Sequence, residues 1–250
     1  MKIYQTDLLN KFTNLTHAFT TKDGGVSLKP YSSLNLAFHV NDNPLDVVKN
    51  HKILASQLNY NQKTLVHMKQ IHSNKVHIVN NKDNFDNPPT CDALITNKTN
   101  IALMVMVADC SPILFYDDTQ KVIAVAHAGR QGAFKNILQN LLQSFVQDFK
   151  SNIKDINVSL GASIRECCYE VGEEIYKEAK ELALEYAIQK KENRYYLNIN
   201  KILLTQLYEA GIQKENIEIS NECTCCKNNK YFSYRADGIS GRFCGLLVLN

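Results

Sequence analysis

The feature that most constrains the fold is a series of apolar segments between residues 101 and 126. Residues 101–108 (IALMVMVA) are apolar almost throughout, and residues 113–116 and 122–126 form two shorter apolar runs. A continuous apolar run of this length, bounded by polar residues, is typical of a strand covered on both faces. We therefore expect a central sheet whose two faces are both buried.

Helical periodicity is clearest over residues 133–149. Apolar side chains recur there at steps of three and four residues, which places them on one face of a helix. The other expected elements are a capped helix at 44–58, helices near 173–188 and at 199–210, a strand pair across 64–79, a surface loop at 80–90 and a last strand at 243–249. The predicted class is mixed α/β, and the absence of a linker or repeat predicts a single catalytic domain over 1–250.

Composition argues against several classes of protein. The chain of 250 residues is 44% hydrophobic and 21% charged, which is typical of a globular protein with one substantial core. Its net charge of +3 is not gathered into a basic run with interleaved aromatics, so nucleic acid is not an expected partner. The first residues lack a signal-like apolar stretch, and no segment approaches the roughly 18 apolar residues of a membrane span. We expect a cytoplasmic protein whose eight cysteines are reduced.

The segment 108–132 (ADCSPILFYDDTQKVIAVAHAGRQG) contains the residues that suggest chemistry. A turn with a two-residue loop between its apolar runs would pair Asp117 with Gln120. In that register Cys110 lies directly opposite His127. The Cβ atoms of opposed residues are about 4.5 to 5.5 Å apart, and a zinc ion bonded at about 2.3 Å to sulfur and about 2.0 Å to nitrogen bridges such a gap.

The hairpin alone leaves the site incomplete. Pro112 cannot donate to the ladder and is expected to end the pairing early. A cysteine at a strand end is often a small buried hydrophobe, and a catalytic zinc needs a third protein ligand. The candidates by residue type are His17, His39, His51, His67, His72 and His77. His51 is expected on the surface of its helix and His72 at a turn between two strands, but spacing does not choose among the six.

A series of motifs runs through the chain in a fixed order. They are AFTTKDGG (18–25), SLNLAFHV (33–40), QIHSNKV (70–76), CDALIT (91–96), ADCSPIL (108–114), AHAG (126–129), GASIRECCYEVG (161–172), and CT followed by YFSYRADGISGR (223–224, 231–242). With these motifs the chain resembles, over nearly its whole length, the YfiH-type family. Its members were first described as laccase-like or multicopper polyphenol oxidases and are now regarded as purine nucleoside phosphorylases with adenosine deaminase activity.

The resemblance implies that His72, Cys110 and His127 bind one zinc ion per chain, and so it supplies the third ligand. It also implies a layered sandwich of mixed β-sheets and helices, with the metal at a surface pocket. The implied substrates are phosphate and a purine nucleoside, namely adenosine, inosine or, as a further candidate, methylthioadenosine. Three protein ligands leave a fourth position open, where zinc can polarise a substrate group or lower the pKa of water to about 7 for deamination.

Phosphate requires an anion site next to this metal. Gly129 and Gly132 lie in the segment expected to precede the helix at 133–149, and free amides at a helix N-terminus attract anions. Arg130 is a candidate clamp for the phosphate. The family pattern usually has arginine where this chain has Lys22, and tryptophan and arginine where it has Arg130 and a glutamine. We expect Lys22 and Arg130 to supply the positive charge together.

Three other functions fit parts of this pattern. A Cys110 thiol opposite His127 is also the arrangement of a metal-free Cys-His hydrolase, which would suit the editing of cytoplasmic peptidoglycan precursors. One cysteine with two histidines resembles part of a copper oxidase site, although the seven histidines are too few for an additional trinuclear cluster. A non-catalytic metal-binding module is the third alternative. Turnover measured with and without a chelator distinguishes them.

The remaining cysteines are expected to be structural. Cys167 and Cys168 are adjacent, so they do not easily face one metal ion. Cys223, Cys225 and Cys226 contain one C-x2-C pair without evident partners. Packing is therefore their expected role, with a structural zinc as the alternative.

Three charged residues are given supporting roles. Asp92 is expected either to orient a neighbouring histidine or to cap a turn. Arg235 and Asp237, in a segment where the family usually has a second arginine in place of alanine, are expected to form an internal ion pair.

Overall fold

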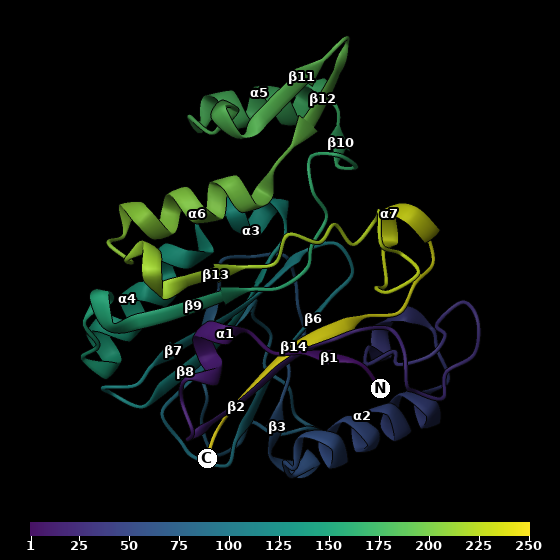
Figure 1. The fold of residues 1–250 in the computed structure, drawn as a ribbon, viewed down its shortest axis with the longest axis vertical. Coiled ribbons are helices and arrows are strands. Elements are labelled where there is room, and N and C mark those ends of the chain that lie inside the picture. The colour runs from purple at the N-terminus through teal and green to yellow at the C-terminus, as the bar shows by residue number, and fades with distance from the viewer.

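The computed structural model describes residues 1–250, which form two large stacked β-sheets, a small third sheet and seven α-helices (Figure 1). The five-stranded sheet has the order β1 (Ile3–Tyr4), β2 (Leu15–Thr20), β14 (Phe243–Leu249), β6 (Ala102–Val107), β3 (Leu65–Val66). The six-stranded sheet has the order β13 (Ile217–Ile219), β9 (Ile156–Leu160), β7 (Ser111–Asp117), β8 (Val122–Ala128), β5 (Ala93–Thr96), β4 (Val76–Ile78). The small sheet, at the top of Figure 1, has the order β10 (Glu170–Val171), β12 (Arg194–Leu197), β11 (Ile188–Lys191). The helices are α1 (Asp7–Asn10), α2 (Pro44–Leu58), α3 (Arg130–Phe134), α4 (Ile137–Phe149), α5 (Glu173–Glu181), α6 (Ile199–Glu209) and α7 (Tyr234–Asp237).

Alternation along the strands sorts the buried side chains into separate cores. In β6, Leu103 and Val105 belong to the core between the two large sheets, whereas Met104 and Met106 belong to the core that α2 covers. Successive side chains of a strand point to opposite faces, so a strand that is buried on both sides must be apolar throughout. This confirms the expectation for residues 101–108, since all of β6 is buried.

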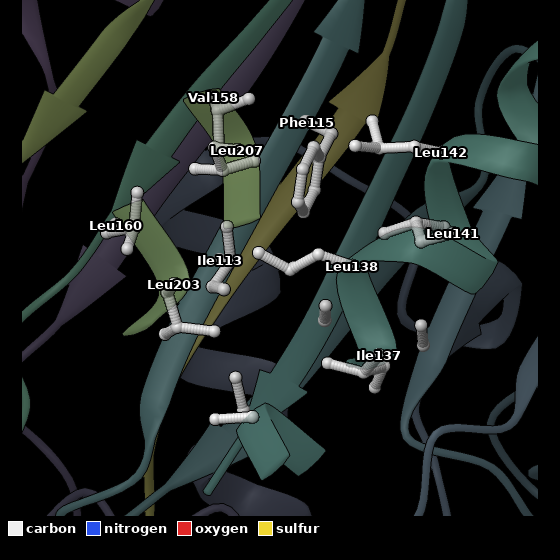
Figure 2. Close-up of a cluster of buried hydrophobic side chains, with 14 of the residues drawn as sticks. Ile113, Phe115, Ile137, Leu138, Leu141, Leu142, Val158, Leu160, Leu203 and Leu207 are labelled. Atoms are coloured by element: carbon white, nitrogen blue, oxygen red, sulfur yellow. The ribbon is translucent and has the colours of Figure 1, made fainter. Parts of the chain in front are cut away.

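The outer face of the six-stranded sheet is covered by α4 and α6. Figure 2 shows Ile113 and Phe115 of β7 beside Leu138 of α4 and Leu203 of α6, and all four side chains are fully buried. Each contributes about 1.5 to 3 kcal/mol of transfer free energy when buried. The layers therefore run from α2 through the two sheets to α4 and α6, which confirms the expected α/β sandwich.

Several predicted elements are confirmed. Helix α2 has the predicted bounds, and the side chain of Asn43 caps it by accepting a hydrogen bond from the backbone N–H of Leu45 at 3.0 Å. Helix α6 and strand β14 also lie where the sequence placed them. None of the helices has the length and apolar character needed to cross a membrane.

The predicted helix at 133–149 is divided in two. It begins earlier, as α3, and is interrupted before α4 by Asn136, whose φ of 51° is left-handed. The Asn136 side chain accepts a hydrogen bond from the backbone N–H of Gln139 at 3.1 Å and so caps α4. Apolar periodicity continues across such a break, because both helices bury the same face, and periodicity alone therefore does not reveal it.

Two further expectations were wrong. The helix predicted near 173–188 ends at Glu181, Ala183 adopts a left-handed φ of 56°, and Ile188 begins β11. The strands expected to pair across 64–79 exist as β3 and β4 but belong to different sheets. The loop between them crosses from one large sheet to the other and contains His72.

Candidate metal centre and its cavity

The β7–β8 hairpin differs in register from the predicted one. Asp117 pairs with Val122, so His127 lies opposite Pro112 and not opposite Cys110. The carboxylate of Asp117 accepts hydrogen bonds from two backbone N–H groups of the loop, at 2.8 and 3.2 Å, and these bonds stabilise a turn two residues longer than expected.

Cys110 and His127 nevertheless meet. Side chains alternate along a strand with a period of two, so a two-residue difference in register leaves every side chain on the same face. The ligand atoms of Cys110, His127 and His72 all lie within 4.8 Å of one another. The pairing also continues past Pro112 to Ser111, contrary to expectation, because Pro112 and His127 form a pair without mutual backbone hydrogen bonds. The Pro112 carbonyl instead accepts from the Gly161 N–H at 2.9 Å, and the His127 N–H donates to Asp92, so the missing proline donor does not weaken this pair.

Asp92 holds both histidines in position. It precedes β5 and lies opposite His127, whose backbone N–H donates to the Asp92 carbonyl at 2.7 Å and whose Nδ1 lies 2.9 Å from Asp92 Oδ1. The same carboxylate accepts hydrogen bonds from the backbone N–H groups of His72 at 3.0 Å and Ser73 at 2.7 Å. The contact at Nδ1 leaves Nε2 of His127 as its free ligand atom. One carboxylate thus orients a histidine and also caps a turn.

His72 is presented by a loop with an unusual backbone conformation. Its φ of 57° is left-handed, which a residue with a side chain adopts when surrounding contacts hold it there. Besides Asp92, Gln70 anchors this loop, because its side-chain amide exchanges two hydrogen bonds, of 2.8 and 3.0 Å, with the backbone of Met106. The side chain of His72 is thereby held at the edge of both sheets.

Gly129 provides the space that the three side chains need. A Cβ atom at this position would lie 2.8 Å from the sulfur of Cys110 and 3.3 Å from Cδ2 of His72. Any larger residue would push the cysteine or the histidine away from their common centre.

Electrostatic interactions favour a thiolate in this group. Burial by itself raises the pKa of the Cys110 thiol, but the attraction and hydrogen bonds of His127 and His72 outweigh it and lower that pKa to about 6. Burial by itself lowers the pKa of His127, yet the charges of Cys110 and Asp92 raise it to about 9. The pKa of Asp92 falls to about 2, because hydrogen bonds from His127 and Ser73 outweigh its burial. A thiolate is the form of cysteine that binds metals and acts as a nucleophile.

The three residues open into a cavity of about 440 Å³ between the sheets and the loops that follow them. The cavity is lined by His39, Gln70, His72, Met106, Val107, Ala108, Asp109, Cys110, His127, Arg130, Ile164, Tyr169, Ile199, Tyr234, Arg235 and Arg242. Asp109 joins the loops around it by accepting hydrogen bonds from the hydroxyls of Thr224 at 2.6 Å and Ser233 at 2.7 Å. Volumes of about 300 to 1,000 Å³ are typical of small-molecule sites.

Of the four residues predicted to bind phosphate, one lines the cavity. Arg130 lines the cavity, and its Nη1 also lies 2.5 Å from Glu178 Oε2 on α5. Gly129 is the N-cap of α3, and Gly132 lies within that helix instead of preceding it. Lys22 does not line the cavity, and its ammonium group donates to the backbone carbonyl of Asn228.

Two arginines of the cavity were not predicted as site residues. Arg235 donates to the backbone carbonyls of Cys168 and Glu170 at 3.1 and 3.0 Å, and Arg242 donates to the carbonyl of Ser240 at 2.8 Å. The expected ion pair of Arg235 with Asp237 is absent, because the arginine reaches across to the loop before β10 instead. Neither arginine forms a salt bridge with a carboxylate, so both bring positive charge to the cavity without a direct ion-pair partner. The closing GISGR motif was the one signal in the sequence for Arg242.

The remaining cysteines lie closer together than the sequence suggested. Cys167, Cys168, Cys223 and Cys226 place their sulfur atoms within 4.8 Å of one another. Adjacent cysteines can face one point because the chain turns there, with the backbone N–H groups of Cys168 and Tyr169 both donating to the carbonyl of Arg165.

The other histidines form no second metal-binding group. His51 is fully buried, contrary to expectation, because its ring stacks on Phe38 at 5.6 Å between centroids and meets Phe85 edge to face at 4.9 Å. His77 pairs with Asp83 at 2.7 Å outside the cavity. The imidazole cluster that a trinuclear copper centre requires is not formed.

The fold and the site define a layered α/β protein with a candidate Cys-His metal centre in a ligand-sized cavity. Residues 16–250 match the family model described as multi-copper polyphenol oxidoreductase laccase. The chain is 32% identical to the purine nucleoside phosphorylase YlmD of Bacillus subtilis over 249 residues, 95% of this chain and 89% of that protein. It is 34% identical to a purine nucleoside phosphorylase of Corynebacterium glutamicum, covering 92% of this chain and 93% of that one. The crystal structure of the hypothetical protein YfiH of Bacillus licheniformis matches with a TM-score of 0.93 at 31% identity, over 99% of this chain and 96% of that one. The chain belongs to this YfiH/YlmD family.

Proposed function

We propose that this chain is a zinc-dependent purine nucleoside phosphorylase that also deaminates adenosine. The observation that carries the proposal is the convergence of His72, Cys110 and His127 in a cavity lined by three arginines. The names of the relatives from Bacillus subtilis and Corynebacterium glutamicum support the same activity.

The donor set fits zinc. One thiolate and two imidazoles within 4.8 Å of one another are ligands that zinc accepts, and the Asp92 contact at Nδ1 of His127 is the usual outer partner of a metal-bound histidine. Zinc bound by these three residues would supply a Lewis acid with an open position facing the cavity. Gly129 keeps the space around the sulfur free.

The arginines suit the phosphate substrate. In phosphorolysis a phosphate oxygen bonds to C1′ of the ribose while the bond from C1′ to the purine nitrogen breaks, and the purine leaves with that electron pair and takes up a proton. Arg235 and Arg242 have no carboxylate partners, so their guanidinium groups can bind and orient the phosphate without first breaking an ion pair. Arg130 must share its charge with Glu178.

The purine can be held by the aromatic side of the cavity. Tyr169 and Tyr234 line it, and the guanidinium of Arg235 lies 5.0 Å from the centre of the Tyr169 ring. Tyrosine rings can stack on a planar purine, and the positive charge of the nearby guanidinium suits a base that leaves with negative charge. Deamination needs water at C6 of adenosine in place of phosphate at C1′, and we expect it to be the slower reaction.

Kinetics with varied phosphate test the proposal. Arg242→Ala should raise the phosphate concentration for half-maximal phosphorolysis by at least about tenfold, as expected for the loss of a charged hydrogen bond of about 1.5 to 3 kcal/mol. Arg130→Ala should have a similar but smaller effect, because Arg130 already shares its charge with Glu178. Lys22→Ala tests the other basic residue that the sequence predicted to bind phosphate. Zinc content should not change. Arg194→Ala, which removes an exposed arginine paired with Glu170, is the matched control.

Chromatography of reactions with and without phosphate separates the two activities. Free base and ribose 1-phosphate should form only when phosphate is present, and inosine should form from adenosine in either case. Folded, zinc-loaded protein that lacks both reactions would rule out the proposed function.

A second candidate is a Cys-His hydrolase, favoured by the lowered pKa of Cys110 beside His127. Such an enzyme would use the Cys110 thiolate as nucleophile and would retain activity after chelation. The phosphorylase should lose activity with its zinc and regain it when zinc is restored, so the two candidates predict opposite results.

A further inference from the structure

We propose that Cys167, Cys168, Cys223 and Cys226 form a second, structural zinc site. The four sulfur atoms lie within 4.8 Å of one another, and the sulfur of Cys226 is 3.5 Å from that of Cys167 and 3.3 Å from that of Cys168. Zinc–sulfur bonds of about 2.3 Å at tetrahedral angles place sulfur atoms roughly 3.8 Å apart. The four thiols are therefore already near the geometry of a single four-thiolate ion.

Other roles for these cysteines fit the geometry less well. A disulfide requires about 2.05 Å between two sulfur atoms and involves only two of the four residues. Apolar packing does not explain why Cys167 and Cys226 are exposed, since structural cysteines that only pack are usually buried. A set of four thiolates selects zinc or iron over the harder cations, and four cysteines are a common ligand set of structural zinc sites.

The backbone around the cluster suits a metal site. The C-x2-C segment turns tightly, with the backbone N–H of Lys227 donating to the Cys223 carbonyl at 3.0 Å. Such a turn brings the first and last residues of the segment close together, as a C-x2-C pair of zinc ligands requires. The sulfur of Cys225 lies near Cys168 but outside the group of four, so Cys225 is not one of the proposed ligands.

The site would join two segments that are distant in the sequence. One contains Cys167 and Cys168 and continues to Tyr169, which lines the cavity, and the other begins at Cys223. Besides the cysteines, two contacts link these segments: the Thr224 N–H donates to the Ser163 carbonyl at 3.1 Å, and Arg235 donates to the carbonyls of Cys168 and Glu170. Zinc would therefore fix one wall of the cavity. This inference is independent of the proposed function, because none of the four cysteines lines the cavity.

Metal analysis of matched variants tests the site. In Cys110→Ser protein, where the centre at His72 and His127 is disabled, we expect about one zinc per chain to remain. Adding Cys226→Ser should remove it, whereas adding Cys225→Ser, a neighbouring cysteine outside the cluster, should not. The wild type should then contain about two zinc ions per chain, in place of the one that the sequence predicted.

Cobalt(II) provides a spectroscopic readout on the wild-type protein, so this test does not require that the Cys226→Ser variant fold. Cobalt bound to the reduced wild-type protein, freed of metal, should give the intense sulfur-to-metal charge-transfer bands of a tetrahedral four-thiolate site. These bands should persist in Cys110→Ser protein. Iron in place of zinc, an absence of metal from Cys110→Ser protein together with weak cobalt bands, or a disulfide within the cluster after purification under reducing conditions would each overturn the proposal.

Discussion

Asp92 connects more of the candidate site than any other single residue. Its carboxylate contacts the ring of His127 and accepts hydrogen bonds from the backbone on either side of His72, although these two histidines come from different parts of the chain. The carboxylate is fully buried, and its hydrogen bonds keep it ionised. A residue outside the cavity lining thus determines where two candidate metal ligands lie.

Asp92→Asn should therefore weaken metal binding. An asparagine cannot accept all of these hydrogen bonds, because its amide nitrogen would face other donors. Loss of such an outer partner typically costs about 10- to 100-fold in metal affinity. Competition with a chelator measures the change. Asp83→Asn removes a similar contact to His77, of 2.7 Å, outside the cavity and serves as the control. Equal zinc affinity in both folded variants would show that Asp92 has no orienting role.

At the scale of single elements, the break between α3 and α4 has a direct bearing on the site. Helix α3 follows Gly129 immediately, so its position fixes the backbone beside Cys110. One continuous helix from Arg130 would carry the chain in a single direction, whereas the turn at Asn136 lets α4 pack along the sheet.

Asn136→Ala should destabilise this junction. The substitution removes the N-cap of α4 and places a Cβ-bearing residue without local hydrogen bonds at a left-handed φ. The expected loss is about 1 to 2 kcal/mol in the free energy of unfolding, measured by urea denaturation. Asn136→Gly keeps the conformation accessible and should lose less. If alanine were as stable as asparagine, the cap would contribute nothing.

At the scale of the whole molecule, the buried histidines should make stability depend on pH. Burial lowers the pKa of His51 to about 3 and that of His17 to about 4. Both are neutral in the folded protein at pH 5 to 6, while the unfolded chain binds protons below about pH 6.5. The contribution of these two histidines to stability is therefore complete above pH 6.5 and falls as the pH decreases toward the folded-state values.

For each of these histidines, the free energy of unfolding should decrease by about 1.4 kcal/mol per pH unit between pH 6.5 and its folded-state pKa. Urea denaturation between pH 7.5 and about pH 5, a range above the titration of most carboxylates, measures the slope. His51→Gln keeps a donor for the Leu36 carbonyl, which His51 contacts at 2.8 Å, and should give a shallower slope.

Much of the architecture could be predicted from local patterns. The apolar run of β6, the periodicity and cap of α2, and the last strand β14 all follow from residues close together in the sequence. Errors occurred where a long-range contact or a backbone conformation decides the outcome, as in the division of α3 from α4 and the assignment of β3 and β4 to different sheets.

For the site, the sequence by itself determined that Cys110 and His127 share one face. The period of a strand is two residues, so the error in the predicted hairpin register left both side chains on the same side. The choice of His72 required the family resemblance. Tertiary structure alone brought Asp92 to both histidines, turned Arg235 and Arg242 into the cavity, and gathered the four cysteines of the second cluster. These contacts join loops that are distant in the sequence. The conformation of such a loop depends on the residues that pack around it, and a local sequence pattern does not show which residues these are.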